Sequence, residues 1–114
     1  MIDFRSYGMG EDKEVLVIEL AGQLDSESCS YFFSCLEDAV EDGASKIVVD
    51  CRALEFISSM GLGMLIRAHA RMKKRGGDVK LARVPGLVVG VFKTTGLDRI
   101  FHIYPSVREA YGSF

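Results

Sequence analysis

Apolar residues recur along the chain with two different periods. A period of two residues predicts strands, and a period of three to four residues predicts helices. Leu16, Ile18 and Leu20 alternate with Val15 and Val17, so residues 14–21 are expected to form a central strand that is apolar on both faces. From residue 26 the apolar positions recur every three or four residues instead, as on one face of an amphipathic helix. The glycine at position 43 is a natural end for that helix.

The remaining elements follow from the same patterns and from the positions of glycine and proline. We expect an edge strand over residues 2–7, a turn over 8–12, a buried strand over 46–51, a loop over 52–57, a helix over 60–74, a strand over 78–82, a helix over 85–94, and a last strand and helix over 101–104 and 106–111. The order is ββαβαβαβα, which predicts an α/β fold with parallel crossovers after an initial hairpin. The prediction is one domain over residues 1–114, with helices packed on a mixed four- to five-stranded sheet.

Composition and charge narrow the classes of function. The 114 residues are 48% hydrophobic and 26% charged, which is ordinary for a globular domain. A net charge of −2 gives no sign of general nucleic-acid binding. No apolar run approaches the ~20 residues that would insert across a membrane.

The charge is unevenly distributed. Residues 1–50 carry 12 acidic and 3 basic side chains, a net −9, and residues 51–114 carry 4 acidic and 11 basic ones, a net +7. This asymmetry predicts either two differently charged faces that steer a protein partner, or a fold that brings the two halves together.

The three cysteines, Cys29, Cys35 and Cys51, are odd in number and form no C-x-x-C pair. A disulfide framework and a zinc site are therefore both disfavoured, and no metal or other cofactor is expected. A reducing cytoplasm suits such a sequence best. The first residues also lack the basic start and long apolar core of a signal peptide.

The segment over residues 56–63 reads Phe-Ile-Ser-Ser-Met-Gly-Leu-Gly and lies where a buried strand passes into an amphipathic helix. A serine at a helix start can cap free backbone N–H groups. The same position suits a phosphate, because those N–H groups and the helix dipole favour negative charge. The segment is therefore either a capped helix start or a phosphorylation site, and the first role is compatible with the second.

Several short motifs occur together in a specific order: Gly22-Gln23-Leu24-Asp25 after a strand, Val49-Asp50-Cys51 ending another, the 56–63 segment, then Gly76-Gly77 and Thr95-Gly96-Leu97. In this combination the chain resembles the STAS domain, the family of bacterial anti-sigma-factor antagonists, over nearly its whole length. The resemblance implies a cytoplasmic switch protein and not an enzyme. In this family a partner anti-sigma kinase phosphorylates one serine at the start of the second helix, the unphosphorylated form binds the kinase and frees a sigma factor, and a serine phosphatase resets the switch.

Aligning Gly61-Leu62-Gly63 with the family's Gly-Leu-Gly places Ser59 at the phosphoacceptor position. Ser58 then replaces the family's Asp and becomes an alternate acceptor, and Met60 replaces a second hydroxyl residue. The partner-binding surface implied by the resemblance consists of Asp25, Ser58, Ser59, Met60, Gly61, Leu62 and Met64. Core packing is the favoured alternative for Leu62, and an N-cap of the first helix is the favoured energetic role of Asp25. Contact with a partner and core packing both remain open for Met64.

Three other functions compete with the switch. The replacement of Asp by Ser58 keeps open a STAS subunit of an ABC-type transport complex that acts without phosphorylation. A small-molecule sensor is a further alternative, although no phosphate-binding loop of the Gly-x-x-x-x-Gly-Lys type occurs. An enzyme is disfavoured, because His69 lies nearly three helical turns from Ser59 and no other activating base is evident. An edge strand within residues 1–10 would be open to pairing, which favours a weak homodimer.

Overall fold

The computed structural model describes residues 2–11 and 14–114, with side chains described for residues 5–11, 14–25 and 28–114. Within these residues five strands and four α-helices follow the predicted order, with one short 3₁₀ helix added before the last strand. They are β1 (Ile2–Met9), β2 (Val15–Leu24), α1 (Ser26–Glu41), β3 (Lys46–Ile57), α2 (Ser59–Lys74), β4 (Asp78–Ala82), α3 (Gly86–Thr95), η1 (Leu97–Arg99), β5 (Ile103–Tyr104) and α4 (Val107–Gly112).

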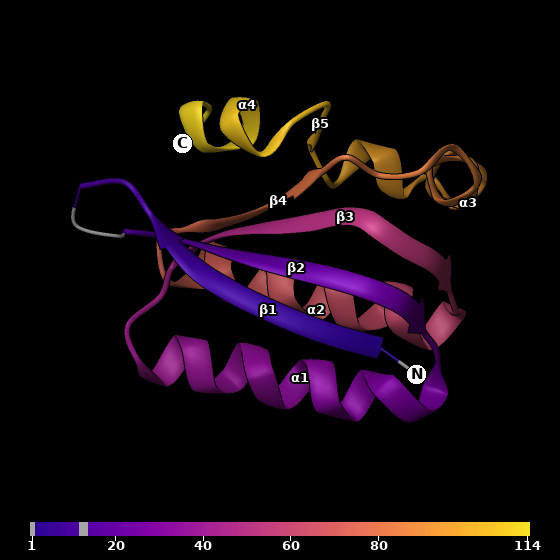
Figure 1. Cartoon of the computed structure of the whole chain (residues 1–114), viewed down its shortest axis with the longest axis horizontal. Coiled ribbons are helices and arrows are strands. Elements are labelled where there is room, and N and C mark those ends of the chain that lie inside the picture. Colours follow the sequence, from indigo (N-terminus) through magenta and orange to yellow (C-terminus); the bar gives the residue numbers. More distant parts are fainter. Residues whose placement is uncertain (1, 12–13) are drawn as a thin grey trace.

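The strands form one mixed sheet in the spatial order β1-β2-β3-β4-β5 (Figure 1). β1 pairs antiparallel with β2, and the other three pairings are parallel. The predicted mixed sheet is therefore confirmed, with five strands. Because β2 and β3 run in the same direction, both end at the same edge of the sheet.

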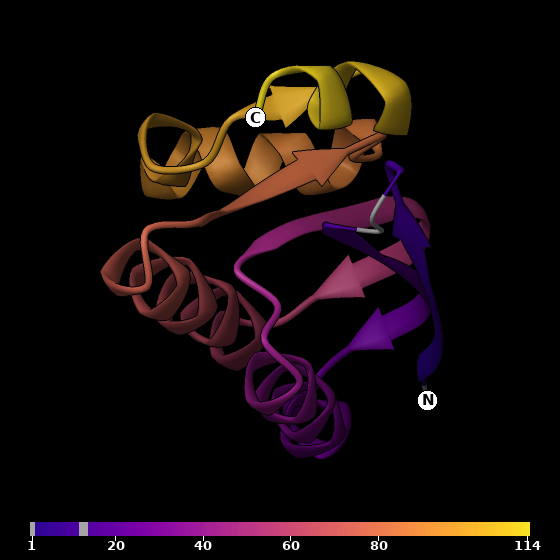
Figure 2. The same ribbon diagram turned by 90° about the vertical axis from the view of Figure 1, so that its left-hand side faces the viewer.

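Helices α1 and α2 pack side by side on one face of the sheet (Figures 1 and 2). The main core lies between these helices and the sheet and continues to α3. It includes Phe32 of α1, Leu65 of α2 and Phe92 of α3, each 1% exposed or less. On the other face, Ala110 of α4 packs in a smaller apolar cluster with Val15, Val17, Val48 and Ala82. Burial of apolar residues on both faces explains why the central strands read as continuous apolar runs.

Residues 52–57, expected to form a loop, are instead the second half of β3. They run parallel to the end of β2, with Ala53 opposite Ala21 and Ile57 opposite Leu24. Leu54 and Ile57 are buried in the core. Two exposed residues precede each of them, so buried positions recur every third residue and not every second one, as a regular strand would require. Register shifts in the β2–β3 ladder break the strict alternation, and the expectation was wrong for this reason.

β1 is also longer than expected, because Gly8 and Met9 continue the pairing opposite Leu16 and Val15. The chain turns after them at Gly10, whose φ of +100° lies in the region that favours glycine. Asp12, the last residue of the expected turn, lies outside the described residues.

Candidate functional site

The serine segment lies where β3 passes into α2, next to the point where β2 passes into α1. The two junctions are joined directly, because the backbone N–H of Ser58 donates to the carbonyl oxygen of Leu24 at 2.9 Å. Asp25 follows Leu24 in the chain, so the fold brings it to the same edge of the sheet as the serine segment. Strand ends of this kind are where parallel sheets commonly bind ligands and partners.

Ser58 is the N-cap of α2. Its backbone is extended, with φ −84° and ψ 169°, and its hydroxyl oxygen accepts a hydrogen bond from the N–H of Gly61 at 3.1 Å. The same hydroxyl also interacts with the buried thiol of Cys29 in α1, where burial raises the pKa of the thiol and the Ser58 hydrogen bond lowers it in part. The hydroxyl of Ser58 is thus held between a helix terminus and a neighbouring helix.

Ser59 is the first residue of α2 and is exposed. Its hydroxyl forms no hydrogen bond with any residue that the structure describes, in contrast to that of Ser58. The first turn of α2 contains no acidic residue. An anionic group on Ser59 would therefore meet the positive end of the helix dipole and no like charge within that turn.

Asp25 caps α1 through a reciprocal pair of hydrogen bonds. Its carboxylate accepts from the backbone N–H of Ser28 at 3.1 Å, and the Ser28 hydroxyl oxygen accepts from the backbone N–H of Asp25 at 3.0 Å. Two free N–H groups at the helix start are satisfied in this way, as in a capping box. The predicted capping role of Asp25 is confirmed, while its contact with a partner stays a prediction.

The two glycines of the segment have different surroundings. A Cβ on Gly61 would lie 2.8 Å from the carbonyl oxygen of Leu24 and 2.9 Å from Cγ1 of Ile57, so only glycine lets α2 approach the strand ends this closely. A Cβ on Gly63 would meet nothing within 4 Å. Gly61 is therefore needed for packing, whereas Gly63 leaves a flat, exposed place on the helix.

The apolar residues of the segment are likewise of two kinds, buried in the core or exposed beside Ser59. Leu62 is 7% exposed and belongs to the core, as the packing interpretation expected. Met64 is partly buried and packs against that core. Met60 is 52% exposed and, with Phe56 at 49%, places an apolar surface beside Ser59. Phe56 was absent from the sequence-based site, although a large aromatic residue just before the serines was an available signal.

Other groups that could act in catalysis are engaged elsewhere. His69 lies in the second half of α2, with Nε2 3.3 Å from the Asp78 carboxylate and its ring edge-on to Phe101. Among the described residues, no three His, Cys, Asp or Glu side chains are placed to hold a metal ion. Over the same residues, no helix has the length and apolar character to cross a membrane.

The chain is also similar in sequence to known proteins. A family model described as the STAS domain matches residues 9–110. An anti-sigma F factor antagonist of Paenibacillus polymyxa is 26% identical over 103 residues, which cover 90% of this chain and 88% of that protein.

Solved structures are similar over the same extent. An anti-sigma-factor antagonist (STAS) domain protein from Planctomyces limnophilus superposes with a TM-score of 0.81 at 26% identity, covering 96% of this chain and 95% of the other. The Bacillus cell fate determinant SpoIIAA in its phosphorylated form gives a TM-score of 0.76 at 21% identity over 97% and 98% of the two chains, a likeness of fold alone.

Proposed function

The chain belongs to the STAS domain family, and from this premise we propose that it is an anti-sigma-factor antagonist. It binds an anti-sigma regulator in the cytoplasm and thereby releases a sigma factor. Relatives named as anti-sigma factor antagonists that align with nine-tenths of the chain support this regulatory, non-enzymatic role.

The finer proposal is that Ser59 controls this binding as a phosphoacceptor, modified by an anti-sigma serine kinase and reset by a serine phosphatase. The observation that carries it is the difference between two adjacent serines. Ser58 is committed to capping α2 and to Cys29, while the exposed Ser59 hydroxyl has no partner among the described residues. A kinase can reach Ser59 without breaking the helix cap.

The position of Ser59 at the start of α2 also determines how a phosphate there would act. A phosphate on serine adds about −1.5 to −2 charges at neutral pH. At the start of α2 this charge is compatible with the free N–H groups and the dipole, so the fold should persist. The effect must then arise at the interface, where the phosphate displaces a partner from the apolar surface of Phe56 and Met60 by its bulk, hydration and charge.

The experiment is phosphosite mapping of the protein from its native cells, by intact mass and peptide mass spectrometry, with and without stress. We expect one signal-dependent phosphate, on Ser59. A phosphate on Ser58 would contradict the proposal, because it would require release of the α2 cap. Absence of phosphate under all conditions would favour a STAS subunit of an ABC-type transport complex, in which Ser59 is only a contact.

A further inference from the structure

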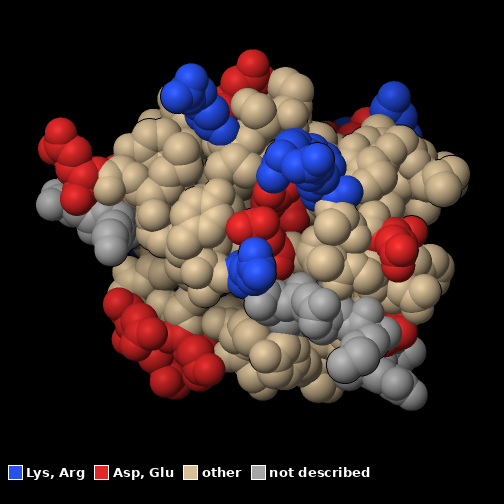
Figure 3. Space-filling view, viewed as in Figure 1, with Lys and Arg blue, Asp and Glu red and all other residues tan. Residues whose placement is uncertain are grey.

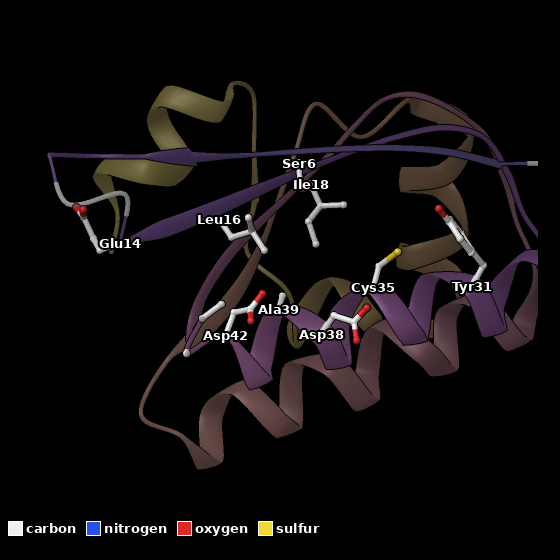
Figure 4. A pocket seen from close by; sticks show the side chains of 11 residues that line it. Ser6, Glu14, Leu16, Ile18, Tyr31, Cys35, Asp38, Ala39 and Asp42 are labelled. Carbon is white, nitrogen blue, oxygen red and sulfur yellow. The ribbon is translucent and has the colours of Figure 1, made fainter.

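A second surface, at the other end of α1 from Asp25, has features that the proposed switch does not use. A cavity of about 680 Å³ lies between β1, the start of β2 and the C-terminal half of α1 (Figure 4). Leu16 and Ile18 of β2 point into it from the sheet, and Cys35 and Ala39 line it from the helix. Its size is within the range of about 300–1,000 Å³ that is usual for ligand-binding sites, so it exceeds the volume of any single side chain.

The cavity exists because β1 carries small residues opposite large ones. Ser6 pairs with Ile18 and Gly8 pairs with Leu16, so the edge strand leaves space beside both apolar side chains, of which Leu16 is partly exposed and Ile18 is buried. α1 packs against β2 and α2, and its outer surface forms the opposite wall. An apolar floor is therefore open at the edge of the sheet.

The rim of this groove is acidic. Asp38 in the last turn of α1 and Asp42 directly after α1 line it from the helix side (Figure 4). Glu14, just before β2, is also a lining residue, but its carboxylate accepts a hydrogen bond from the Tyr111 hydroxyl at 3.0 Å. Figure 3 shows acidic side chains gathered over this end of α1. The groove thus combines an apolar floor with a negative border.

The two aspartates lie at an electrostatically unfavourable end of α1. The last turn of α1 contains no basic residue, and acidic side chains there oppose the negative end of the helix dipole. Glu37 pairs with Arg71, but neither Asp38 nor Asp42 forms an ion pair with a described residue. These two aspartates also lie four residues apart, a spacing at which like charges repel on a helix. A cationic partner would relieve both effects.

The backbone next to the groove indicates the shape of such a partner. Among the described strands β1 has a neighbour, β2, on one side only, so its outer edge presents backbone N–H and C=O groups. An extended segment can pair with such an edge and direct alternate side chains to one face.

We propose that the groove between β1 and α1 docks an extended basic segment of a partner protein. One aliphatic side chain of the segment packs beside Leu16 and Ile18, and Lys or Arg side chains two residues before and after it, which share its face, meet Asp38 and Asp42. The site is separate from Ser59, so docking there does not depend on the proposed switch.

The test measures fluorescence anisotropy of a labelled lysine–leucine peptide, Lys-Ser-Leu-Ser-Lys, added to the full chain, in which leucine and both lysines share one face of an extended segment. Two control peptides replace the lysines by glutamate or the leucine by glycine, and the second of these is the lysine–glycine peptide. We expect only the lysine–leucine peptide to bind. Asp38→Asn and Asp42→Asn should each weaken its binding about two- to fivefold, as for partly exposed ion pairs. Ser6→Val, which fills the space beside Leu16 and Ile18 with a residue suited to a strand, should weaken it about tenfold or more.

Glu41→Gln is the matched control, because it removes the same charge from the same end of α1 at an exposed position that does not line the groove. Its binding should equal that of the unchanged protein. Equal weakening by Glu41→Gln, or equal binding of the lysine–glycine peptide, would show general attraction to an acidic surface and overturn the proposal.

Two further measurements keep the test decisive. Alkylation of Cys35 should slow when the lysine–leucine peptide is bound, whereas Cys29 and Cys51, at most 1% exposed, should stay unreactive with or without it. Sedimentation equilibrium of the chain alone tests whether a second copy of the chain occupies the groove. Self-association that Ser6→Val abolishes would assign the groove to a second copy of the chain and overturn the proposal.

Discussion

At the scale of single residues, the candidate site is built from neighbours of the same type with different tasks. Ser58 caps α2 and Ser59 faces solvent. Gly61 permits close packing, and Gly63 leaves open space. Substitutions at these two pairs therefore separate structural from functional contributions.

The serine pair predicts unequal losses of stability. Ser58→Ala removes the hydroxyl that accepts from the N–H of Gly61, so it should lower the free energy of unfolding by about 1 kcal/mol. Ser59→Ala removes an exposed hydroxyl and should change it by less than about 0.5 kcal/mol. Urea unfolding of the two variants measures the difference, and equal losses would show that the cap is shared.

The second prediction concerns binding at Ser59. Ser59→Asp should keep the fold, because a carboxylate at the start of α2 suits the helix dipole, but should lose the anti-sigma regulator. Ser59→Ala should bind the regulator under all conditions. Thermal unfolding and co-purification with the regulator give the two readouts. Unfolding of Ser59→Asp would make the position structural, and unchanged binding would remove the switch.

The glycine pair predicts changes of opposite sign. Gly61→Ala places a methyl group 2.8 Å from the carbonyl oxygen of Leu24, and the resulting shift should destabilise the fold by about 1–3 kcal/mol. Gly63→Ala has free space and should raise the free energy of unfolding by up to about 1 kcal/mol, because alanine favours a helix. Chemical unfolding of both variants tests this, and a loss at Gly63 would contradict it.

At the scale of elements, the sequence predicted the type and order of every strand and α-helix but not all their lengths. Apolar periodicity is sufficient for β2, α1 and α2, since each has one consistent period. The second half of β3 was missed because tertiary pairing with the end of β2, and not local alternation, makes it a strand.

For the candidate site, the sequence predicted the location but not the role of each serine. Parallel topology was enough to bring Asp25 and the serine segment together. The sequence could not distinguish the roles of Ser58 and Ser59, because either can start the helix. That distinction depends on the extended backbone of Ser58, which the close contact of Gly61 with β2 and β3 favours.

The end of α1 predicts that stability and docking oppose each other. Asp38→Asn removes a negative charge from the last turn of a helix with no basic residue there, so it should raise the free energy of unfolding by about 0.3–1 kcal/mol. The gain should shrink in high salt, where such charges are screened. Urea unfolding at low and high ionic strength measures both effects. A loss of stability at low salt would show that Asp38 has a favourable contact.

At the scale of the whole molecule, the structure confirms that the fold brings the two oppositely charged halves together, while the steering of a partner stays a prediction. Asp50 from the acidic half is buried and forms a bidentate pair with Arg83 from the basic half. Glu37 of α1 forms a single, partly exposed contact with Arg71 of α2. The fold thus joins the halves through their charges. The end of α1 stays acidic, which leaves a face for a cationic partner.

Burial of thiols also makes the free energy of unfolding of the whole fold decrease at alkaline pH. Cys51 is fully buried, and this burial, together with the neighbouring Asp50 carboxylate, raises the pKa of its thiol to about 12. In the unfolded chain the thiol titrates near its ordinary pKa of about 8.5. Between these values the unfolded state releases a proton that the folded state retains.

The contribution of Cys51 to stability is therefore complete below about pH 8.5 and falls as the pH rises toward 12, by up to about 1.4 kcal/mol per pH unit. Burial raises the pKa of Cys29 and of Tyr7 as well, so these groups act with the same sign. Cys51→Ala should flatten the decline of the unfolding free energy that urea titrations measure between about pH 8 and pH 11. Cys35→Ala, at a half-buried thiol, should keep most of the decline. An unchanged slope in Cys51→Ala would mean that the buried thiol ionises without unfolding, and that water reaches the centre of β3.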